Sequence, residues 1–287
     1  MIDRIDARTR VCAVIGNPIY HSLSPAIHNA GYRALDLPFV YVAFQVEDVA
    51  AAVAGMRGLS LAGLSVTIPH KTSVIPHLDG LDAVAEKLGS VNTVYWKDGK
   101  LWGTSSDGYG ALRALESGAI DVTGRKIVFL GAGGVARAIG FTLALERPLR
   151  EMVFLEAVQP ELARALCAEL GARTPARARS RPLDPGSLEL ELRDADVLVQ
   201  CTPVGMTPKV GETLVPRNLL HPGLAVFDTV YTPALTRLMQ EAEVAGCPLA
   251  YGREMFLYQA AIQFELFTGR SAPLEAMREA LDAALAG

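Results

Sequence analysis

The feature that most constrains the fold of this 287-residue chain is a glycine-rich segment between a predicted strand and a predicted helix. The buried-type strand expected at 126–130 runs directly into Gly131-Ala132-Gly133-Gly134-Val135-Ala136, which fits the pattern G-x-G-x-x-G/A. In this pattern the first glycine allows a tight turn, the second lets the backbone approach a pyrophosphate, and the last small residue allows close helix–strand packing. Exposed amides at the helix start then face the phosphate charge. The segment therefore predicts an α/β unit that binds a dinucleotide.

A carboxylate follows the next predicted strand, at 152–155, and bears on the choice of dinucleotide. Glu156 lies about 20 residues beyond the glycine-rich segment, where a carboxylate accepts hydrogen bonds from ribose hydroxyls and repels a 2′-phosphate. The adjacent Ala157 and Val158 supply no positive charge. These residues favour NAD over NADP. The alternative is that an arginine from 173–181, a stretch expected to be a solvated loop, binds a 2′-phosphate.

Apolar runs alternate with helical patterns along the chain, which indicates an α/β fold with largely parallel strands. Ser24 is predicted to cap a helix that begins at Pro25, and Lys71 is predicted to lie at the start of another helix. A hairpin is expected around Asp98-Gly99. Further strands are expected at 11–15, 39–44, 61–68, 195–201 and 224–227.

Composition excludes several classes of function. Half of the residues are apolar, 20% are charged and the net charge is −4, so no clustered basic surface for nucleic acid is indicated. No apolar run reaches the roughly 18 residues of a membrane span, and the N-terminus lacks a secretory signal pattern. The four cysteines show no metal-binding or disulfide spacing. We therefore expect a cytoplasmic protein without a metal and without a nucleic-acid or membrane partner.

Several polar residues stand at predicted strand and helix ends. The hydroxyls of Ser22 and Ser24, helped by the positive end of a helix, suit a bound carboxylate. Taken singly, each has a plainer explanation: Ser24 as a helix cap, Lys71 as a solvated cation, and Asp107-Gly108 as a turn pair. Their spacing alone does not join them into one site.

A family resemblance joins them, because the ordered motifs resemble those of shikimate dehydrogenases over nearly the whole chain. The resemblance implies a discontinuous substrate-binding catalytic domain at 1–107 and 253–287, beside a Rossmann dinucleotide-binding domain at 108–252. It also implies reversible NAD(P)-dependent reduction of 3-dehydroshikimate to shikimate, a precursor of aromatic amino acids. The motifs are His21-Ser22-x-Ser24-Pro25, Val66-Thr67-x-Pro69-x-Lys71, Val91-Asn92-Thr93, Asp107-Gly108, the glycine-rich segment, and Gln259-Ala260.

The same resemblance assigns roles residue by residue. It implies that Ser22 and Ser24 bind the substrate carboxylate and that Lys71 and Asp107 form the catalytic pair. An ammonium can stabilise and protonate a developing alkoxide, while a carboxylate orients the amine and a hydroxyl. The residues expected to bind the ring hydroxyls and the reacting oxygen are Thr67, Asn92, Asp107 and Gln259, with Tyr231 nearby. The expected cofactor-binding residues are Gly131, Ala132, Gly133, Gly134, Val135, Ala136, Glu156, Thr202 and Gly252.

The chain departs from the family pattern at three places. Ser65 stands where the family commonly has Asn, and Ser105-Ser106 stands where it has Asn-Thr. Glu156-Ala157-Val158 replaces the usual Asn-Arg-Thr, which resembles the minority of quinate/shikimate dehydrogenases that use NAD. That activity is the alternative enzyme. A non-catalytic nucleotide or metabolite sensor is the alternative of another class, although it would be expected to lose Lys71 and Asp107. Both a monomer and a homodimer are compatible with the sequence.

Overall fold

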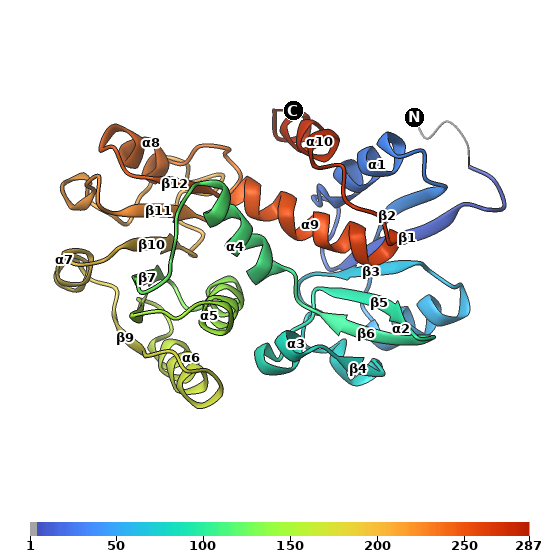
Figure 1. Ribbon diagram of the computed structural model, residues 1–287, viewed down its shortest axis with the longest axis horizontal. Helices are drawn as coiled ribbons and strands as arrows, with labels where there is room; N and C mark the ends of the chain where they lie inside the picture. The colour runs from blue at the N-terminus through green and yellow to red at the C-terminus, as the bar shows by residue number, and fades with distance from the viewer. Residues whose placement is uncertain (1–4, 287) are drawn as a thin grey trace. The chain divides into compact units, whose positions relative to one another are not determined.

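The computed structural model describes residues 5–286 and divides into two compact units. The first unit runs to Ser106 and resumes at Leu257, and the second is Asp107–Phe256. In Figure 1 the first unit is coloured from blue to teal and again in red, and the second from green to orange. Compared with the boundaries expected from the sequence, this division assigns Asp107 and residues 253–256 to the second unit.

A mixed six-stranded sheet forms the centre of the first unit, in the order β2-β1-β3-β5-β6-β4. β1 pairs in parallel with both β2 and β3, whereas β5 is antiparallel to β3 and to β6. Asp98 and Gly99 join β5 to β6 with φ of 51° and 72°, as a tight primed turn requires, so the predicted hairpin is confirmed. The strands are β1 (Arg10–Gly16), β2 (Phe39–Gln45), β3 (Gly63–Val66), β4 (Gly80–Leu81), β5 (Thr93–Lys97) and β6 (Lys100–Thr104).

Two local predictions in this unit are wrong. Leu23, not Ser24, is the N-cap of α1, and Ser24 lies within the first turn of that helix. Lys71 lies in an irregular turn that leads into a short 3₁₀ helix, η1, and not at the start of an α-helix. The helical segments here are α1 (Ser24–Ala34), α2 (Val49–Gly58), η1 (Ile75–His77), α3 (Ala83–Leu88), α10 (Leu274–Ala286) and part of α9 (Gly252–Thr268).

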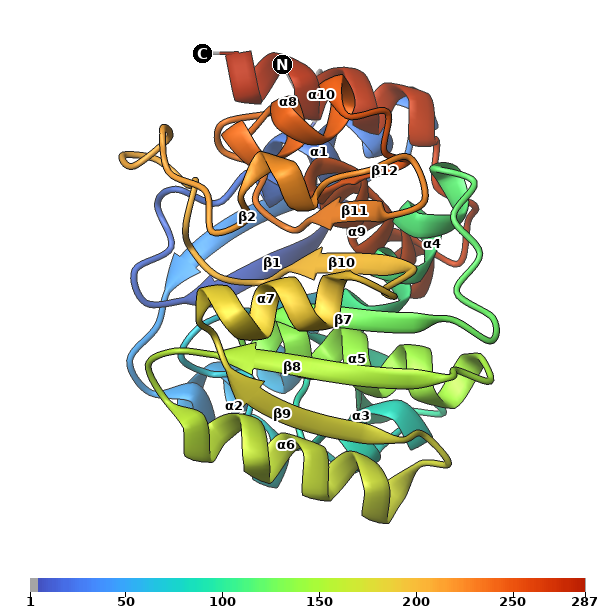
Figure 2. The same cartoon turned by 90° about the vertical axis from the view of Figure 1, so that its left-hand side faces the viewer.

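The second unit contains a fully parallel six-stranded sheet in the order β12-β11-β10-β7-β8-β9. Figure 2 shows these strands one below the other, with α7 in front of the sheet. Leu188 of α7 and Leu238 of α8 share a buried apolar cluster with Val128 of β7 on this face. The strands are β7 (Lys126–Leu130), β8 (Glu151–Glu156), β9 (Ala178–Pro182), β10 (Val197–Gln200), β11 (Ala225–Asp228) and β12 (Leu249–Tyr251).

Helices on the opposite face complete the α/β layers that the sequence predicted. Phe129 and Phe154 stack on this face with their ring centroids 4.5 Å apart, and a side chain at Gly140 of α5 would contact Phe154. The helical segments of this unit are α4 (Asp107–Ser117), α5 (Gly134–Glu146), α6 (Pro160–Arg173), α7 (Pro185–Leu192), η2 (Arg217–Leu219) and α8 (Arg237–Val244). Within residues 5–286 no helix is both long and apolar enough to cross a membrane.

The arginine-rich stretch is not a solvated loop, because residues Ala178–Pro182 form the edge strand β9. Arg179 donates to both Glu151 and Glu191, and Arg181 donates to Glu191 at 2.6 Å. The side chain of Glu191 is only 2% exposed and also pairs with Lys126 at 3.0 Å. Arg179, and then Lys126, hold the pKa of Glu191 down at about 2. Paired charges therefore let a basic segment join the sheet.

The core of the first unit contains a fully buried histidine, His28 of α1. Its ring stacks on Tyr41 with a centroid separation of 4.2 Å, and Phe264 and Phe267 lie beside it. Neither ring nitrogen makes a hydrogen bond of ordinary geometry within the described residues. Burial lowers the pKa of His28 to about 3, against a weak opposing effect of nearby Gln263. His28 is therefore neutral in the folded protein well below neutral pH.

This burial predicts acid sensitivity. Between pH 6.5 and about 3 an unfolded chain protonates His28 but the folded chain does not, so stability falls as the pH falls through this window. The contribution approaches about 1.4 kcal/mol per pH unit. Urea unfolding at pH 7, 6, 5 and 4 should show that His28→Phe, which keeps the stacking, loses less stability on acidification than the wild type. Parallel losses in the two proteins would contradict the assignment.

Candidate active site

Strand pairing in the first unit brings the end of β3 next to the start of β5. Because β5 is antiparallel to β3, Ser65 near the end of β3 pairs with Thr93 at the start of β5. The amide of Val66 donates to the carbonyl of Asn92 at 2.7 Å. Thr67 follows directly after β3 and is half-buried. Thr67 and Asn92, both predicted to contact the substrate, therefore lie on adjacent segments.

The structure also brings Asn92 and Gln259 together, through Ser106. Asn92 Nδ2 donates to Ser106 Oγ at 3.0 Å, and the Ser106 amide donates to Asn92 Oδ1 at 2.9 Å. Ser106 Oγ donates to Gln259 Oε1 at 3.4 Å. All three side chains are buried. Two amides and a hydroxyl thus form one polar cluster of the kind that binds hydroxyl groups.

Ser22 and Ser24 are neighbours at the start of α1. The amide of Ser24 donates to Ser22 Oγ at 3.3 Å. Ser24 is buried, and its hydroxyl lies within hydrogen-bonding reach of Tyr41. Tyr41 in turn donates to Ser65 Oγ at 2.6 Å. The serine pair predicted to hold a carboxylate is therefore linked to the end of β3.

The two predicted catalytic residues lie next to the segments that carry Asn92 and Ser106. The carbonyl of Lys71 accepts from the amide of Val91 at 2.8 Å, which ties its turn to the segment that carries Asn92. Asp107 follows Ser106 directly and is the first residue of α4, where a carboxylate is stabilised by the helix dipole. Tyr231 belongs to the second unit, where its ring packs on Phe256 at 5.1 Å and burial raises its pKa. The roles of all three remain predictions.

The glycine-rich segment has the geometry that its pattern predicts. Gly131 has φ of +91°, and a Cβ atom there would lie 3.0 Å from Thr202 Cγ2. Gly133 is the N-cap of α5, and Gly133, Gly134 and Val135 are exposed. Ala136 is fully buried. The first turn of α5 therefore presents its amides to solvent, as phosphate binding requires.

Glu156 is tied to this segment by its carboxylate. Its Oε2 accepts from the amide of Ala132 at 3.0 Å, and its Oε1 accepts from the amide of Val158 at 2.8 Å. The negative charge thus lies at the end of β8, directly beside the glycine-rich segment. Thr202 borders Gly131, as noted above, and donates to Gln200 at 3.0 Å. Gly252 instead lies close to the carbonyl of Thr229, at the start of α9.

Two buried polar residues, Gln263 and Asp228, were not predicted from the sequence as candidate site residues. Gln263 joins the Asn92 cluster by donating to Thr93 Oγ1 at 3.0 Å, and its spacing of four residues from Gln259 was the available signal. Asp228 is buried at the end of β11, and burial raises its pKa to about 6. It accepts from Thr236 at 2.6 Å. Among the residues described, no cluster of His, Cys, Asp and Glu could hold a metal ion.

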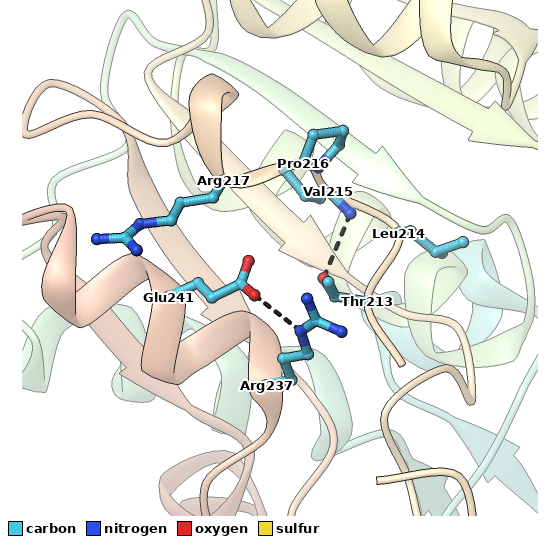
Figure 3. Close-up of a pocket in the computed structure, with 7 residues that line it drawn as sticks. All are labelled: Thr213, Leu214, Val215, Pro216, Arg217, Arg237 and Glu241. Carbon is cyan, nitrogen blue, oxygen red and sulfur yellow. Dashed lines mark hydrogen bonds and ion pairs between the residues drawn. The ribbon is translucent and has the colours of Figure 1, made fainter. Parts of the chain in front are cut away.

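A separate surface pocket of about 500 Å³ lies in the second unit, and none of the predicted site residues lines it (Figure 3). Arg237 is paired there with Glu241 at 2.7 Å, and Thr213 accepts from the amide of Val215 at 3.3 Å. Arg237, Glu241 and Thr213 are therefore engaged within the pocket, and we do not assign the predicted substrate or cofactor site to it.

The parallel sheet and glycine-rich turn of the second unit define the class of Rossmann-type α/β proteins. The family model "Shikimate dehydrogenase substrate binding domain" matches residues 14–94, and "Shikimate 5'-dehydrogenase C-terminal domain" matches residues 252–281. The Shikimate dehydrogenase (NADP(+)) of Methanopyrus kandleri is 47% identical over 281 residues, or 96% of each chain. The chain belongs to the shikimate dehydrogenase family.

Solved structures agree with this assignment. The crystal structure of shikimate 5-dehydrogenase from Listeria monocytogenes in complex with shikimate and NAD has a TM-score of 0.92 at 36% identity. The match covers 96% of this chain and 98% of that chain. Quinate dehydrogenase from Corynebacterium glutamicum in complex with NAD has a TM-score of 0.89 at 28% identity, with coverage of 96% and 99%.

The conformation of Gly131 gives a testable prediction. Gly131→Ala should lower affinity for NADH or NADPH by roughly tenfold or more, because the new methyl group strains the turn and displaces Thr202. Gly124→Ala is the matched control, since Gly124 also has positive φ, at +70°, but precedes β7 and has nothing near its missing Cβ. Both variants should lose about 1 kcal/mol of stability or more. Fluorescence titration that finds equal nucleotide affinities in the two would refute the placement.

Proposed function

We propose that the chain catalyses the reversible NAD(P)-dependent reduction of 3-dehydroshikimate to shikimate. The observation that carries the proposal is the buried cluster of Asn92, Ser106 and Gln259, in a member of this family. Fixed amide and hydroxyl groups can recognise a ring that carries several hydroxyls. A ring with its oxygens in a different pattern would leave some of these buried groups without a hydrogen-bond partner, which weakens its binding. Lys71 and Asp107 supply the acid–base chemistry: Asp107 directly follows Ser106, and the turn that carries Lys71 is hydrogen-bonded to Val91, next to Asn92.

The residues of the second unit fit a dinucleotide. The positive φ of Gly131, the exposed first turn of α5 and the carboxylate of Glu156 match the turn, phosphate and ribose contacts of such a site. The other proposed contacts are Ala132, Gly134, Val135, Ala136, Thr202 and Gly252. When bound, NAD(P) supplies or accepts the hydride.

The chain's own residues bind the substrate and move the proton. Ser22 and Ser24 donate hydrogen bonds to the carboxylate, strengthened by the N-terminal end of α1. Reduction of the ketone generates an alkoxide, which the Lys71 ammonium stabilises and protonates; in the reverse direction the Lys71 amine removes that proton. Asp107 accepts a hydrogen bond from a substrate hydroxyl. The residues proposed to contact the remaining ring oxygens are Thr67, Asn92, Gln259 and Tyr231.

The position of Glu156 supports a preference for NAD, a finer point than the family itself provides. The Methanopyrus kandleri relative is named for NADP(+), whereas the Listeria monocytogenes structure contains NAD. In this chain a carboxylate stands beside the glycine-rich segment. Two of the arginines at 173–181 that could compensate a 2′-phosphate are engaged, since Arg179 and Arg181 bind Glu191.

A second candidate is an NAD-dependent quinate/shikimate dehydrogenase. It is favoured by Glu156, by the hydroxyls of Ser65 and Ser106 where the family has larger side chains, and by the likeness to a quinate dehydrogenase in complex with NAD. The sensor alternative is disfavoured because Lys71 and Asp107 are both present. The expectations of a cytoplasmic location and of a monomer or homodimer stay predictions.

Removing the proposed acid–base group tests the mechanism. Lys71→Ala should lower kcat for shikimate oxidation by roughly 100-fold or more, the scale of a lost general acid–base. The KM for the nucleotide and the midpoint of thermal unfolding should change little. Lys100→Ala, an exposed lysine of the same unit, is the control and should keep its activity. Turnover near the wild-type value in Lys71→Ala would remove this lysine from the chemistry.

The cofactor preference has its own test. Because the Glu156 carboxylate repels a 2′-phosphate, kcat/KM should be higher with NAD than with NADP. Glu156→Gln removes the charge at nearly constant shape and should shift the ratio toward NADP by roughly tenfold. The combination Glu156→Asn, Ala157→Arg and Val158→Thr should shift it further. Better use of NADP by the unmodified enzyme, or an unchanged ratio in Glu156→Gln, would contradict the role of this carboxylate.

A further inference from the structure

A buried chain of hydrogen bonds leads from the edge of the first unit's sheet to the polar cluster around Asn92. The Tyr41 hydroxyl donates to Ser65 Oγ at 2.6 Å, and Ser65 Oγ donates to Gln263 Oε1 at 2.8 Å. Gln263 Nε2 donates to Thr93 Oγ1 at 3.0 Å, and Thr93 Oγ1 donates to Asn92 Oδ1 at 2.6 Å. All five side chains are at least nine-tenths buried.

This series of hydrogen bonds runs in a single direction, because each hydroxyl can donate only one proton. Tyr41 donates to Ser65, so the Ser65 proton goes to Gln263 Oε1. With its oxygen accepting from Ser65, the amide of Gln263 turns its Nε2 toward Thr93. Thr93 accepts there, which leaves its own proton for Asn92 Oδ1. Burial raises the pKa of Tyr41, so the first donor keeps its proton.

Two donors on Asn92 Oδ1 determine which end of that amide is the oxygen. These are Thr93 Oγ1, at 2.6 Å, and the Ser106 amide, at 2.9 Å; the Ser106 hydroxyl also lies 3.2 Å from the same oxygen. Nδ2 then donates to Ser106 Oγ at 3.0 Å, and the Ser106 hydroxyl has two acceptors for its own proton, Asn92 Oδ1 at 3.2 Å and Gln259 Oε1 at 3.4 Å. Rotating the Asn92 amide by 180° would place N–H groups against N–H and O–H donors.

We propose that Gln263 is a positioning residue that fixes the amide orientation of Asn92 toward the oxygens of the substrate ring. Gln259 and Gln263 are four residues apart on α9, so both amides lie on one face of the helix. Ser65, in the place of the family's Asn, is the partner that turns Gln263 toward Thr93. The inference rests on the proposed function, in which Asn92 and Gln259 contact the substrate.

A double-mutant cycle tests the proposal. Gln263→Met keeps the length of the side chain but removes its donor, and should lower kcat/KM for shikimate by roughly tenfold, the loss expected from one hydrogen bond. The KM for the nucleotide should not change. In an Asn92→Ala background the same substitution should add less than about twofold, because its effect runs through Asn92. Thr93→Val, which removes the relaying hydroxyl at constant shape, should behave in the same way.

The control and the contrary results separate this inference from the function on which it rests. Gln240→Met, on the exposed side of α8, should leave kcat/KM for shikimate unchanged. Losses from Gln263→Met and Asn92→Ala that multiply fully would overturn the positioning role, since a purely structural effect is independent of Asn92. An Asn92→Ala enzyme with an unchanged KM for shikimate would instead overturn the substrate site itself.

Discussion

Parallel pairing of strands is the constraint on which the arrangement of this protein depends. In a parallel pair the strands end at the same edge of the sheet, so the loops that follow them gather there. In the second unit β7 ends at the glycine-rich segment and β8 ends at Glu156, and the hydrogen bond from Ala132 to Glu156 joins the two. In the first unit β1 leads toward Ser22 and β3 leads to Thr67. Most of the predicted ligand-binding residues stand just beyond such strand ends.

Sequence patterns could predict those parts of the fold that are determined by neighbouring residues. The glycine-rich segment needs positive φ at Gly131, and only a strand-to-helix turn of one kind satisfies its spacing. The Asp98-Gly99 turn specifies its hairpin in the same way. The helix start at Ser24 could not be predicted as well, because Leu23 already adopts a helical conformation and the serine lies one residue further in.

Features that depend on distant partners were out of reach of local patterns. The arginines of β9 were expected to form a solvated loop because their partners Glu151 and Glu191 lie on other elements, β8 and α7, which only the fold brings beside them. The same holds for the bond between Ser65 and Gln263, which spans 198 residues. The residue types of the site followed from the family resemblance, whereas the hydrogen bonds that orient Asn92 required the fold.

The central claim is that the cluster of Asn92, Ser106 and Gln259 recognises shikimate in an oxidoreductase. Initial rates of nucleotide reduction, measured with shikimate and with quinate at varied concentration, test it most directly. If this cluster recognises shikimate, nucleotide reduction depends on shikimate and has a higher kcat/KM with shikimate than with quinate, whichever nucleotide is supplied. No shikimate-dependent reduction of NAD or NADP, or a higher kcat/KM for quinate, would contradict it.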